Sequence, residues 1–595
     1  MNETQIEALG ISVMTDHLDS IGGWPVLGTK PGGNWNESSF DIMSDLVSIR
    51  YSGVSPFIQV FLGLDEKDSG KRMIKIGEAK LGLTTRDYYF NAEHQNLRDA
   101  YLKYSINIAT LLGADPDTAN TDMKAVFDLD MQLANLSLTK IEQRNRDDAY
   151  NKMTIEELEH HYPTPTEGHV KMNWHELIQG IMGLAEENIT IEKSEPIILT
   201  VPKYYKEIFK VLEQQEVRTL RNYMIWSVVQ QYVRRLPKRF VDELAEYRKA
   251  HDGTKVKESR WKKCSHRTTR TFGIAAGRLF IKETFDEESK QKALDMIHDI
   301  REAFNERLSD LEWMDEQTRA VAKEKALHIR EKMGYMIFIY SEMEINKDEY
   351  FGNMLRITKV WTKNALKSLR EPYKKEDSWW ETAPATVNAY YTPLLNLISF
   401  PAGMLQPPYY SKYQPRSMNY GSIGFLIGHE ITHAFDDVGR KYDKEGNRRQ
   451  WWSNEAIQRF TNKTKCIIDQ YNNYVMPLAK INLDGEYTLG ENIADNGGVQ
   501  QSYKAYQNWR QKSETKEPRL PGVNFTHNQL FFINFAQGWC GVATKEFEIN
   551  MVPTDTHSPG RYRIIGTLQN NQEFSDVFNC PVGSYMNPEQ KCHVW

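Results

Sequence analysis

Apolar residues recur at helical spacing through much of the first half of the chain. From Ala293 to Leu308 they follow one another at steps of four, three, four and four residues, which predicts one long amphipathic helix. Thr284 and Glu287 form a capping-box pattern just before it, so the helix is expected to begin there. The stretch from Arg218 to Tyr247 predicts another long helix. The residues up to about 335 are therefore predicted to be mostly α-helical.

The pattern changes near residue 380. Thr386 to Tyr391 and Leu394 to Phe400 are short apolar and β-branched runs bounded by prolines, which predicts short strands and loops. Helical periodicity then returns in three stretches, residues 422–434, 453–474 and 530–547, with Ser453 as an expected N-cap. No internal repeat or low-complexity linker is visible in the sequence. The pattern therefore predicts a mainly α protein with small β elements.

Composition and charge exclude several classes of protein. The chain has 595 residues, of which 40% are apolar and 26% charged, and this is ordinary globular usage with enough material for more than one packed core. The 74 basic and 80 acidic residues give a net charge of -6, so no basic field indicates nucleic acid or anionic lipid. No run of eighteen apolar residues and no N-terminal signal pattern occurs, which predicts a soluble chain as written.

Two features bear on the cellular compartment. Six Asn-X-Ser/Thr sequons are candidate glycosylation sites, which accept glycans only in a protein that enters the secretory path. They lie at Asn2, Asn36, Asn135, Asn188, Asn462 and Asn524. The five cysteines form no C-x-x-C pair, which argues against a cysteine-rich zinc site or a thioredoxin motif. Because sequons also arise by chance, these residues alone leave the compartment open.

The strongest local motif is His429-Glu430-Ile431-Thr432-His433. On a helix, residues four apart share one face, so both imidazoles can reach a single Zn²⁺ while Glu430 lies beside the open coordination position. The apolar residues just before the motif would bury this helix, and a buried histidine pair needs a partner. The alternative is a pair of surface histidines on an exposed helix.

A catalytic zinc takes three protein ligands and one water, so a third ligand must come from elsewhere. The two other common zincin patterns, H-E-x-x-H-x-x-G-x-x-H and H-x-x-E-H, do not occur in the chain. Glu491 and Asp495 are one helical turn apart, so Glu491 can bind the metal while Asp495 accepts the outer N–H of a zinc histidine. Gly497 and Gly498 follow, which predicts that this helix ends sharply there. Taken alone, the Glu491–Asp495 pair also suits a solvated helix face.

Several segments, in this order along the chain, resemble neprilysin and the endothelin-converting enzymes. They are residues 387–391, 400–408, 428–437, 490–495, 557–560 and 592–595. The resemblance runs from Met1 to Trp595 and is densest after residue 380. Because several independent motifs occur in the order of that family, the resemblance is highly specific.

The resemblance implies a mainly α fold in which two helical lobes enclose a central cavity, one of them a thermolysin-like zincin catalytic lobe. An outer lobe, incomplete at its N-terminus, is expected at residues 1–330, connecting segments at 331–380 and the catalytic lobe at 381–595. The implied activity is that of a zinc endopeptidase, extracellular or at the cell surface. It would cut short bioactive peptides on the amino side of hydrophobic residues, and nucleic acid is not an expected partner.

Family roles carry over to the metal site residue by residue. The resemblance implies one Zn²⁺ per chain, bound by His429, His433 and Glu491. Glu430 would activate the zinc-bound water and shuttle its proton, and Asp495 would orient a zinc histidine. These roles agree with the chemistry of zinc, which supplies Lewis acidity and lowers the pKa of a bound water.

The resemblance also assigns residues to the substrate. His557 would hydrogen-bond the oxyanion, Arg563 would contact a substrate carbonyl, and Asn388 with the Ala389 backbone would hold the peptide extended. The pocket for the residue after the scissile bond is expected to be lined by Met404, Tyr409, Phe425, Leu426 and Trp539.

The chain departs from the family pattern at this pocket and at its start. Tyr409 stands where Phe is common, and Gly538 stands where a β-branched residue is expected, so the pocket is expected to be reshaped but apolar. Family members begin with a cytoplasmic tail, one membrane-spanning helix and an extracellular stretch, whereas Met1 matches a later point. A membrane is therefore an expected partner only through an N-terminal anchor absent from this chain.

Cysteine pairing is also implied by the resemblance. Cys466 would pair with Cys592, and Cys264, Cys540 and Cys580 would each pair with a cysteine upstream of Met1. Each such bond is typically worth about 2–5 kcal/mol in a secreted protein. The chain as written is therefore expected to fold poorly without an upstream region.

Two alternative functions remain open on the sequence alone. The first is an inactive truncated product or a peptide-binding ectodomain, although a binding module would have no need of Glu430. The second is an intracellular zinc hydrolase with reduced thiols, which would be favoured if no sequon is glycosylated. No feature of the sequence indicates an oligomeric state.

Overall fold

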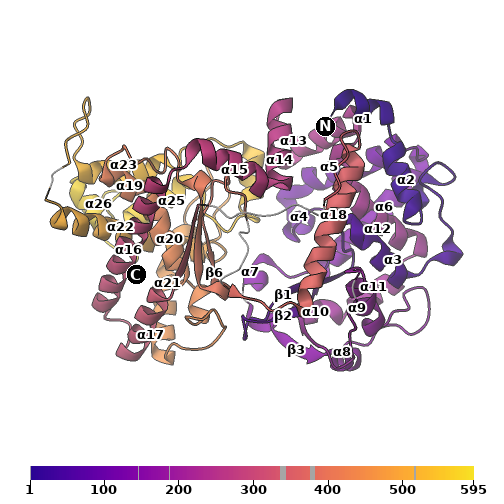
Figure 1. Ribbon diagram of the computed structural model, residues 1–595, viewed down its shortest axis with the longest axis horizontal. Coiled ribbons are helices and arrows are strands. Elements are labelled where there is room, and N and C mark those ends of the chain that lie inside the picture. The colour runs from indigo at the N-terminus through magenta and orange to yellow at the C-terminus, as the bar shows by residue number, and fades with distance from the viewer. Residues whose placement is uncertain are drawn as a thin grey trace. The chain divides into compact units, whose positions relative to one another are not determined.

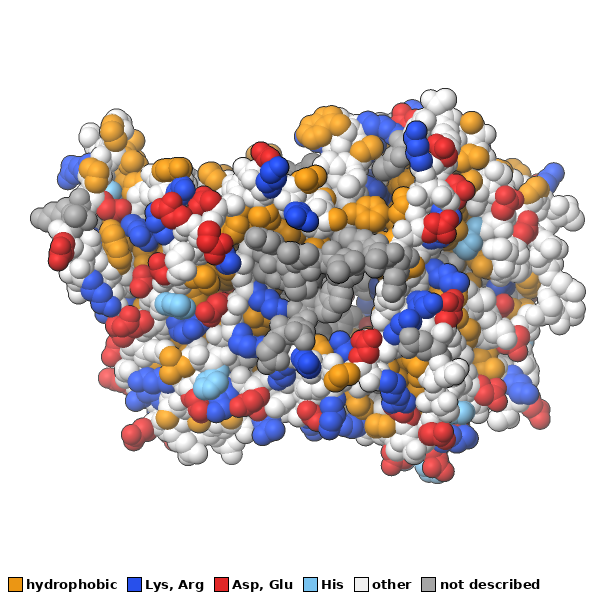
Figure 2. All heavy atoms as spheres, viewed as in Figure 1, with side chains coloured by type: hydrophobic (Ala, Val, Ile, Leu, Met, Phe, Trp, Pro, Cys, Tyr) orange, Lys and Arg blue, Asp and Glu red, His pale blue; other side chains and the backbone are white. Residues whose placement is uncertain are grey.

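Helices make up most of the chain, as predicted (Figure 1). The computed structural model describes residues 2–144, 146–186, 188–256, 258–334, 343–375, 382–514 and 517–595. The chain divides into two units. Unit 1 comprises Met1–Asp65, Gly70–Lys257 and Tyr340–Tyr373, and unit 2 comprises Glu66–Ser69, Glu258–Ile339 and Lys374–Trp595. Figure 2 shows acidic and basic side chains interspersed over the visible face, in keeping with the small net charge.

Unit 1 is a helical body with one sheet. Its long helices are α5 (Gln95–Leu111), α6 (Pro116–Leu136), α12 (Val217–Tyr232), α13 (Lys238–Asp252) and α18 (Tyr350–Lys367). Helix α5 packs against α6 and α13, and α6 also packs against α12. The sheet consists of β1 (Ile58–Leu64), β2 (Arg72–Glu78), β3 (Asn151–Thr154) and β4 (Pro196–Leu199) in the order β1-β2-β4-β3, with β2 and β4 parallel. The sequence pattern did not predict this sheet.

The predicted helix over residues 218–247 is two helices in the structure. Helix α12 ends at Tyr232, a 3₁₀ turn covers Val233–Arg235, and α13 begins at Lys238. Leu236 between them is extended, with φ -90° and ψ 173°. The break follows from Pro237, which has no N–H to donate and disfavours helical backbone in the residue before it.

Unit 2 is built on long helices that pack around a large aromatic and aliphatic core. The main ones are α16 (Glu287–Asp310), α17 (Glu316–Leu327), α20 (Phe425–His433), α21 (Asn454–Asn472), α22 (Leu489–Lys512), α23 (His527–Gln537), α24 (Lys545–Met551) and α25 (Gly560–Gln569). The predicted stretch at residues 530–547 is therefore divided between α23 and α24. A three-stranded sheet has the order β5-β7-β6, with β5 at Arg330–Gly334, β6 at Tyr390–Thr392 and β7 at Leu397–Pro401.

Helix ends test the predicted caps. Ser453 is the N-cap of α21, where its side chain accepts a hydrogen bond from the Ala456 N–H, so this prediction is confirmed. The capping box at Thr284 is wrong. Thr284 is the last residue of α15 (Gly273–Thr284), and Asp286 instead caps α16 by accepting from the Ser289 N–H. An aspartate one residue before the helix is as good a cap as a threonine, which the pattern of spacing alone did not distinguish.

The two units do not divide at residue 330. Helices α14 (Arg260–Thr271), α15, α16 and α17 belong to unit 2, whereas α18 belongs to unit 1. The expected connecting segment at 331–380 includes α18 and lies partly outside the described residues. Periodicity predicts that these segments are helical, but it does not show which of the two cores their apolar faces pack against. The points at which the chain crosses between units were therefore not predictable from local sequence.

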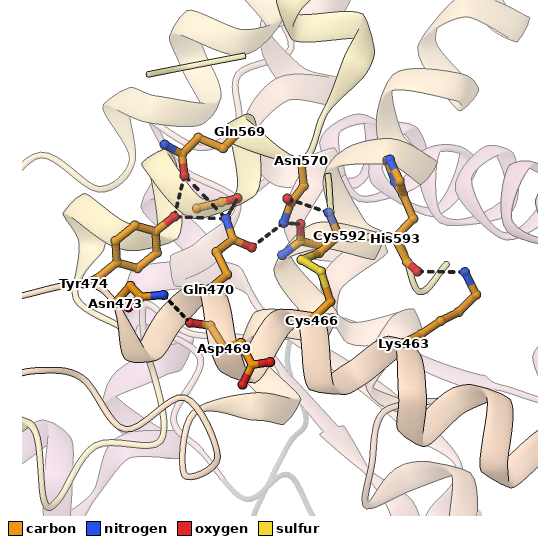
Figure 3. The surroundings of a disulfide bond; sticks show 12 residues. Lys463, Cys466, Asp469, Gln470, Asn473, Tyr474, Gln569, Asn570, Cys592 and His593 are labelled. Carbon is orange, nitrogen blue, oxygen red and sulfur yellow. Dashed lines mark hydrogen bonds between the residues drawn. A yellow bond between two sulfur atoms is a disulfide. The ribbon is translucent and has the colours of Figure 1, made fainter. Parts of the chain in front are cut away.

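The C-terminus of the chain is fixed to α21. Cys466 of α21 forms a disulfide with Cys592, which confirms the predicted pairing (Figure 3). Around it, the Cys592 N–H donates to Asn570 Oδ1 at 3.0 Å and Lys463 Nζ donates to the His593 carbonyl at 3.3 Å. The three other cysteines form no disulfide within the described chain: Cys264, Cys540 and Cys580.

Candidate metal centre

The site forms where α20 packs against α22. A Cβ at Gly498 would lie 2.6 Å from the His429 nitrogen, and one at Gly428 would lie 2.7 Å from the Gly498 carbonyl oxygen. Glycine at these positions lets the two helix backbones approach closely. The predicted helix end at Gly497 and Gly498 is therefore wrong, because α22 continues to Lys512 and uses its glycines for packing.

The three predicted metal ligands converge at this crossing. His429 and His433 lie on α20 and Glu491 lies in the first turn of α22. The two histidine Nε2 atoms are 2.9 Å apart, and Glu491 Oε2 lies 3.2 Å from that of His429 and 3.3 Å from that of His433. His429 is 3% exposed, so the alternative of a surface histidine pair is excluded.

Each histidine is oriented by a second carboxylate. His429 Nδ1 lies 2.9 Å from Asp495 Oδ1, and His433 Nδ1 lies 2.7 Å from Asp436 Oδ2. A carboxylate accepts a hydrogen bond, so in the neutral imidazole the proton resides on Nδ1 and Nε2 carries a lone pair. Asp495 has the position that the sequence predicts for it. Asp436 was not predicted, although its place three residues after His433 puts it within reach along the chain.

The lone pairs at the centre lack a positive partner. Glu491 Oε2 is buried and accepts no hydrogen bond from a described residue. It faces two Nε2 atoms that, in the tautomers above, are acceptors as well. Buried acceptors directed at one point are unfavourable unless a cation joins them. The donor set of two imidazoles and one carboxylate is that of catalytic zinc sites, so the residues fit this metal.

Without a cation, protons compete for the same atoms. Burial disfavours a charged imidazole, but the carboxylates of Glu491 and Asp436 outweigh it and raise the pKa of His433 well above its ordinary value. Burial likewise favours neutral Glu491, but the two imidazoles lower its pKa well below the ordinary value. Metal binding at this centre is therefore expected to weaken as the pH falls.

Glu430 lies between the two histidines on α20, and only 5% of it is exposed. Among the described residues, none donates a hydrogen bond to its carboxylate. Burial is the largest influence and raises the pKa of Glu430, partly offset by the nearby imidazoles. A carboxylate with a raised pKa and free lone pairs can accept a proton from a neighbouring group.

A buried ion pair supports the His429 side of the centre. Arg563 on α25 donates through Nη2 to Asp495 Oδ1 at 2.6 Å and through Nε to Asp495 Oδ2 at 2.8 Å. Its guanidinium also lies over the Trp539 ring, 3.9 Å from the centroid. Burial would raise the pKa of Asp495, but Arg563 and His429 lower it. Arg563 thus keeps Asp495 ionised and able to accept from His429.

His557 completes the polar edge of the centre. Its Nε2 lies 3.2 Å from Glu491 Oε2, and its Nδ1 lies 2.8 Å from Asp555 Oδ1. The side chain is 42% exposed, so it can meet a molecule arriving from solvent. The sequence predicted His557 but not Asp555, which precedes it by two residues.

Comparison with known proteins decides the family. Two family models, both described as peptidase family M13, match residues 1–336 and 388–594. The chain belongs to peptidase family M13. It is 39% identical to endothelin-converting enzyme 1 of Rattus norvegicus, over all of this chain and 77% of that enzyme. It is 40% identical to an endothelin-converting enzyme homolog of Locusta migratoria, over all of this chain and 81% of that protein.

A solved structure gives the same result. The zinc metalloprotease Zmp1 of Mycobacterium tuberculosis, in complex with an inhibitor, superposes with a TM-score of 0.89 at 26% identity, over all of this chain and 87% of Zmp1. The predicted family and mainly helical fold are confirmed, and this M13 protein is a metalloendopeptidase.

The apolar residues predicted for the M13 pocket lie beside the metal ligands. Phe425 precedes His429 by one turn, with the two ring centroids 6.0 Å apart, and it meets the Trp539 ring edge-on at 6.2 Å. Tyr409 Oη donates to the Gly538 carbonyl at 3.2 Å, and a Cβ at Gly538 would approach the Tyr409 ring at 3.0 Å. The two departures from the family pattern are thus in contact. The other two residues predicted for this pocket, Met404 and Leu426, are buried in the same core.

Asn388 and Ala389 lie just before β6, the edge strand of the three-stranded sheet. Asn388 is exposed and its Oδ1 accepts a hydrogen bond from the Ala389 N–H at 3.0 Å. Strand β6 contacts α20, which carries the two histidines. The predicted peptide-binding residues therefore directly precede an edge strand that contacts the helix of the two histidines.

Lys325 supports the centre from α17 and was not predicted. It is fully buried, and its Nζ donates to the carbonyls of Ala434 at 2.6 Å and Gly439 at 2.8 Å. Burial lowers the pKa of Lys325 to about 7. Between these carbonyls lies Asp436, whose Oδ1 accepts from the Gly439 N–H at 2.6 Å. Lys325 therefore fixes the loop that presents Asp436 to His433.

Two further findings concern the compartment. The six sequon asparagines, named above, are all exposed. Among the helices of the described chain, none is long and apolar enough to cross a membrane.

Proposed function

We propose that this protein is a zinc-dependent endopeptidase that hydrolyses short peptides on the amino side of hydrophobic residues. The observation that carries the proposal is the convergence of three acceptor atoms, from His429, His433 and Glu491, beside a buried Glu430 with free lone pairs. A binding module would need neither the converging ligands nor the glutamate. The M13 relatives support the same conclusion.

The proposed zinc would be held by His429, His433 and Glu491. When bound, it supplies Lewis acidity and lowers the pKa of an attacking water. Glu430 then accepts the proton of that water and donates it to the leaving amine. Its raised pKa suits both steps, because a more basic carboxylate takes up the proton more readily and still releases it to an amine.

The substrate would be held by groups that surround this centre. His557 is exposed enough to donate to the developing oxyanion, and Arg563 lies close enough to the ligands to contact a substrate carbonyl. Asn388 and the Ala389 backbone would pair with an extended peptide beside the edge strand β6. The apolar neighbours of His429, chiefly Phe425 and Trp539, favour a hydrophobic side chain after the scissile bond.

We infer an extracellular or cell-surface location. The exposure of all six sequons and the Cys466–Cys592 disulfide support it, because disulfides persist in oxidising compartments. Expression in a secreting cell line followed by glycosidase digestion tests this location. Loss of mass on digestion is expected, and an unchanged mass would contradict it.

The activity is tested by cleavage of a quenched short peptide with an internal Phe or Leu. Wild type is compared with Glu430→Gln and with the exposed control Glu316→Gln, and the zinc content of each is measured. Wild type and the control should cut before the apolar residue. Glu430→Gln should keep its zinc and lose about 10²–10⁴-fold in rate, the usual contribution of a general acid–base. Zinc-loaded, folded wild type that binds the peptide without cutting it would favour the peptide-binding alternative.

A further inference from the structure

Unit 1 contains a cavity that has no role in the function proposed for the metal centre. It measures about 610 Å³ and lies between the edge strand β1, the start of β2, the end of α12 and helix α18. Every residue that lines it belongs to unit 1. A volume of this size lies within the range of small-molecule sites.

The cavity wall is positively charged. Four cationic residues line it: Arg50, Arg72, Lys80 and Arg235. Among the described residues of the lining, none is Asp or Glu. This contrasts with the visible protein surface, where charges of both signs alternate (Figure 2). Several like charges around one concave space raise its potential and attract anions.

Arg50 is a largely buried cation whose guanidinium is only partly hydrogen-bonded. One amino group, Nη2, donates to the Val60 carbonyl at 2.8 Å, but Nε is buried and has no hydrogen-bond partner among the described residues. No described carboxylate forms an ion pair with it. Burial lowers the pKa of Arg50, which shows the penalty on its charge. A buried guanidinium without a counter-ion is unfavourable, and a ligand anion would relieve this.

Arg72 and Lys80 also lack carboxylate partners within the described chain. Arg72 Nη1 donates to the carbonyls of Ser368 at 3.2 Å and Glu371 at 3.4 Å, and its guanidinium lies over the Tyr373 ring at 4.8 Å. Lys80 is exposed at the cavity and makes no side-chain hydrogen bond or ion pair with a described residue. These two groups can turn to a ligand without breaking an existing ion pair.

The rest of the wall is neutral and partly aromatic. Gln59, Gln231 and Thr358 contribute amide and hydroxyl groups. Phe61, Trp361 and Tyr373 contribute aromatic rings, and Trp361 is 45% exposed. Amides and hydroxyls can hydrogen-bond an anion's neighbours, while aromatic faces favour an apolar or planar ligand body.

We propose that this cavity binds a small organic anion, whose carboxylate or phosphate groups pair with Arg50, Arg72 and Lys80 and whose body rests on the aromatic wall. Arginine suits this task because its planar fork binds carboxylate and phosphate oxygens in pairs. The site uses none of the residues of the metal centre.

Calorimetric titration of the full chain tests the proposal. The probes are inorganic phosphate, AMP and phthalate, with adenosine as the uncharged control, and zinc content is checked before and after to exclude metal capture. One saturable site is expected for at least one anion, with affinity that falls as salt is added. Binding of AMP or phosphate would assign a phosphate source, and binding of phthalate alone a carboxylate source.

Variants locate the site. Lys80→Met and Arg72→Met should each weaken binding about tenfold, the loss expected for one charge-assisted hydrogen bond. Arg72→Lys should restore part of it. Lys103→Met, an exposed lysine on α5 outside the cavity, should leave the affinity unchanged. Thermal unfolding confirms that each variant is folded. Absence of saturable binding by all three anions, or equal loss in Lys80→Met and Lys103→Met, would overturn the proposal.

Discussion

Each unit buries a carboxylate among polar side chains, and the two arrangements differ in what they leave unpaired. In unit 1, Asp130 is 2% exposed and accepts hydrogen bonds from the hydroxyls of Tyr89 and Tyr223 and from the Gly82 N–H. The Asp130 carboxylate oxygens therefore accept hydrogen bonds from protein donors and need no bound ion. Burial is the largest influence on Asp130 and raises its pKa to about 6.

In unit 2, the buried carboxylate of Glu491 faces two more acceptors. Glu491 Oε2 accepts no hydrogen bond from a described residue, and the Nε2 lone pairs of His429 and His433 lie 3.2 Å and 3.3 Å from it. Burial of polar groups therefore does not identify a site by itself. An excess of acceptors over donors at one point does, because a positive ion must supply the difference.

The largest expected effect is loss of the proposed metal centre in unit 2, for which a substitution at Asp130 in unit 1 is the control. Glu491→Ala removes one of three ligands, so zinc content and peptide hydrolysis should both fall below detection. Asp130→Asn should retain one zinc per chain. Elemental analysis of the two purified variants, with a peptide assay, checks this. Equal zinc content in Glu491→Ala and wild type would show that the metal is held elsewhere.

A smaller effect is expected from Asp495, the carboxylate that accepts a hydrogen bond from His429. Asp495→Asn replaces an ionised acceptor with a neutral amide, so His429 loses its fixed tautomer. Zinc affinity or turnover should fall by about 10–100-fold. Competition with a chelator measures the affinity. An unchanged affinity and rate would mean that Asp495 only packs with Arg563.

The buried Asp130 in unit 1 should make the free energy of unfolding depend on pH. The pKa of Asp130 rises from 3.8 to about 6 on folding, so the folded state binds more protons between these values. The free energy of unfolding contributed by Asp130 is thus fully present below about pH 4 and is lost as the pH rises through about 6, by roughly 3 kcal/mol.

Urea unfolding of wild type and Asp130→Asn, at intervals between pH 4 and pH 7, measures this contribution. The wild-type free energy of unfolding should show the loss, and the variant should not. Parallel curves for the two proteins would contradict the assignment.

The smallest expected effect concerns the loop behind the zinc helix. Lys325→Met leaves the carbonyls of Ala434 and Gly439 without their donor but also removes a buried charge, so the net loss of stability should be about 1 kcal/mol. The looser presentation of Asp436 should lower zinc affinity more than the control Lys323→Met does, because the partly exposed Lys323 donates to Ser309 and not to this loop. Equal zinc affinity in the two variants would remove Lys325 from the support of the centre.

Local patterns were predictable from the sequence. The spacing of His429 and His433 fixes both on one helix face, and the Ser453 cap lies three residues from the N–H that it accepts from. The family resemblance added the partner of Cys592 and supported Glu491, which the spacing had given only as a candidate third ligand. In each case either a short-range period or a known family pattern carried the information.

Features that depend on tertiary approach were not predictable. Gly497 and Gly498 have the sequence signature of a helix end, yet they lie inside α22 because α20 packs directly against them. The residues next to Lys325 in the sequence are typical of an exposed helix. Only the fold brings its Nζ to the carbonyls of Ala434 and Gly439. In the sheet of unit 1, β2 pairs with β4 although Ile74 and its partner Ile197 are far apart in sequence.

The most direct test of the central claim is a zinc anomalous difference map from a crystal of the full chain. One peak is expected at about 2.0–2.2 Å from His429 Nε2, His433 Nε2 and a Glu491 carboxylate oxygen, and none beside Asp130. A map without that peak from zinc-loaded protein, or with the metal held by other residues, would contradict it.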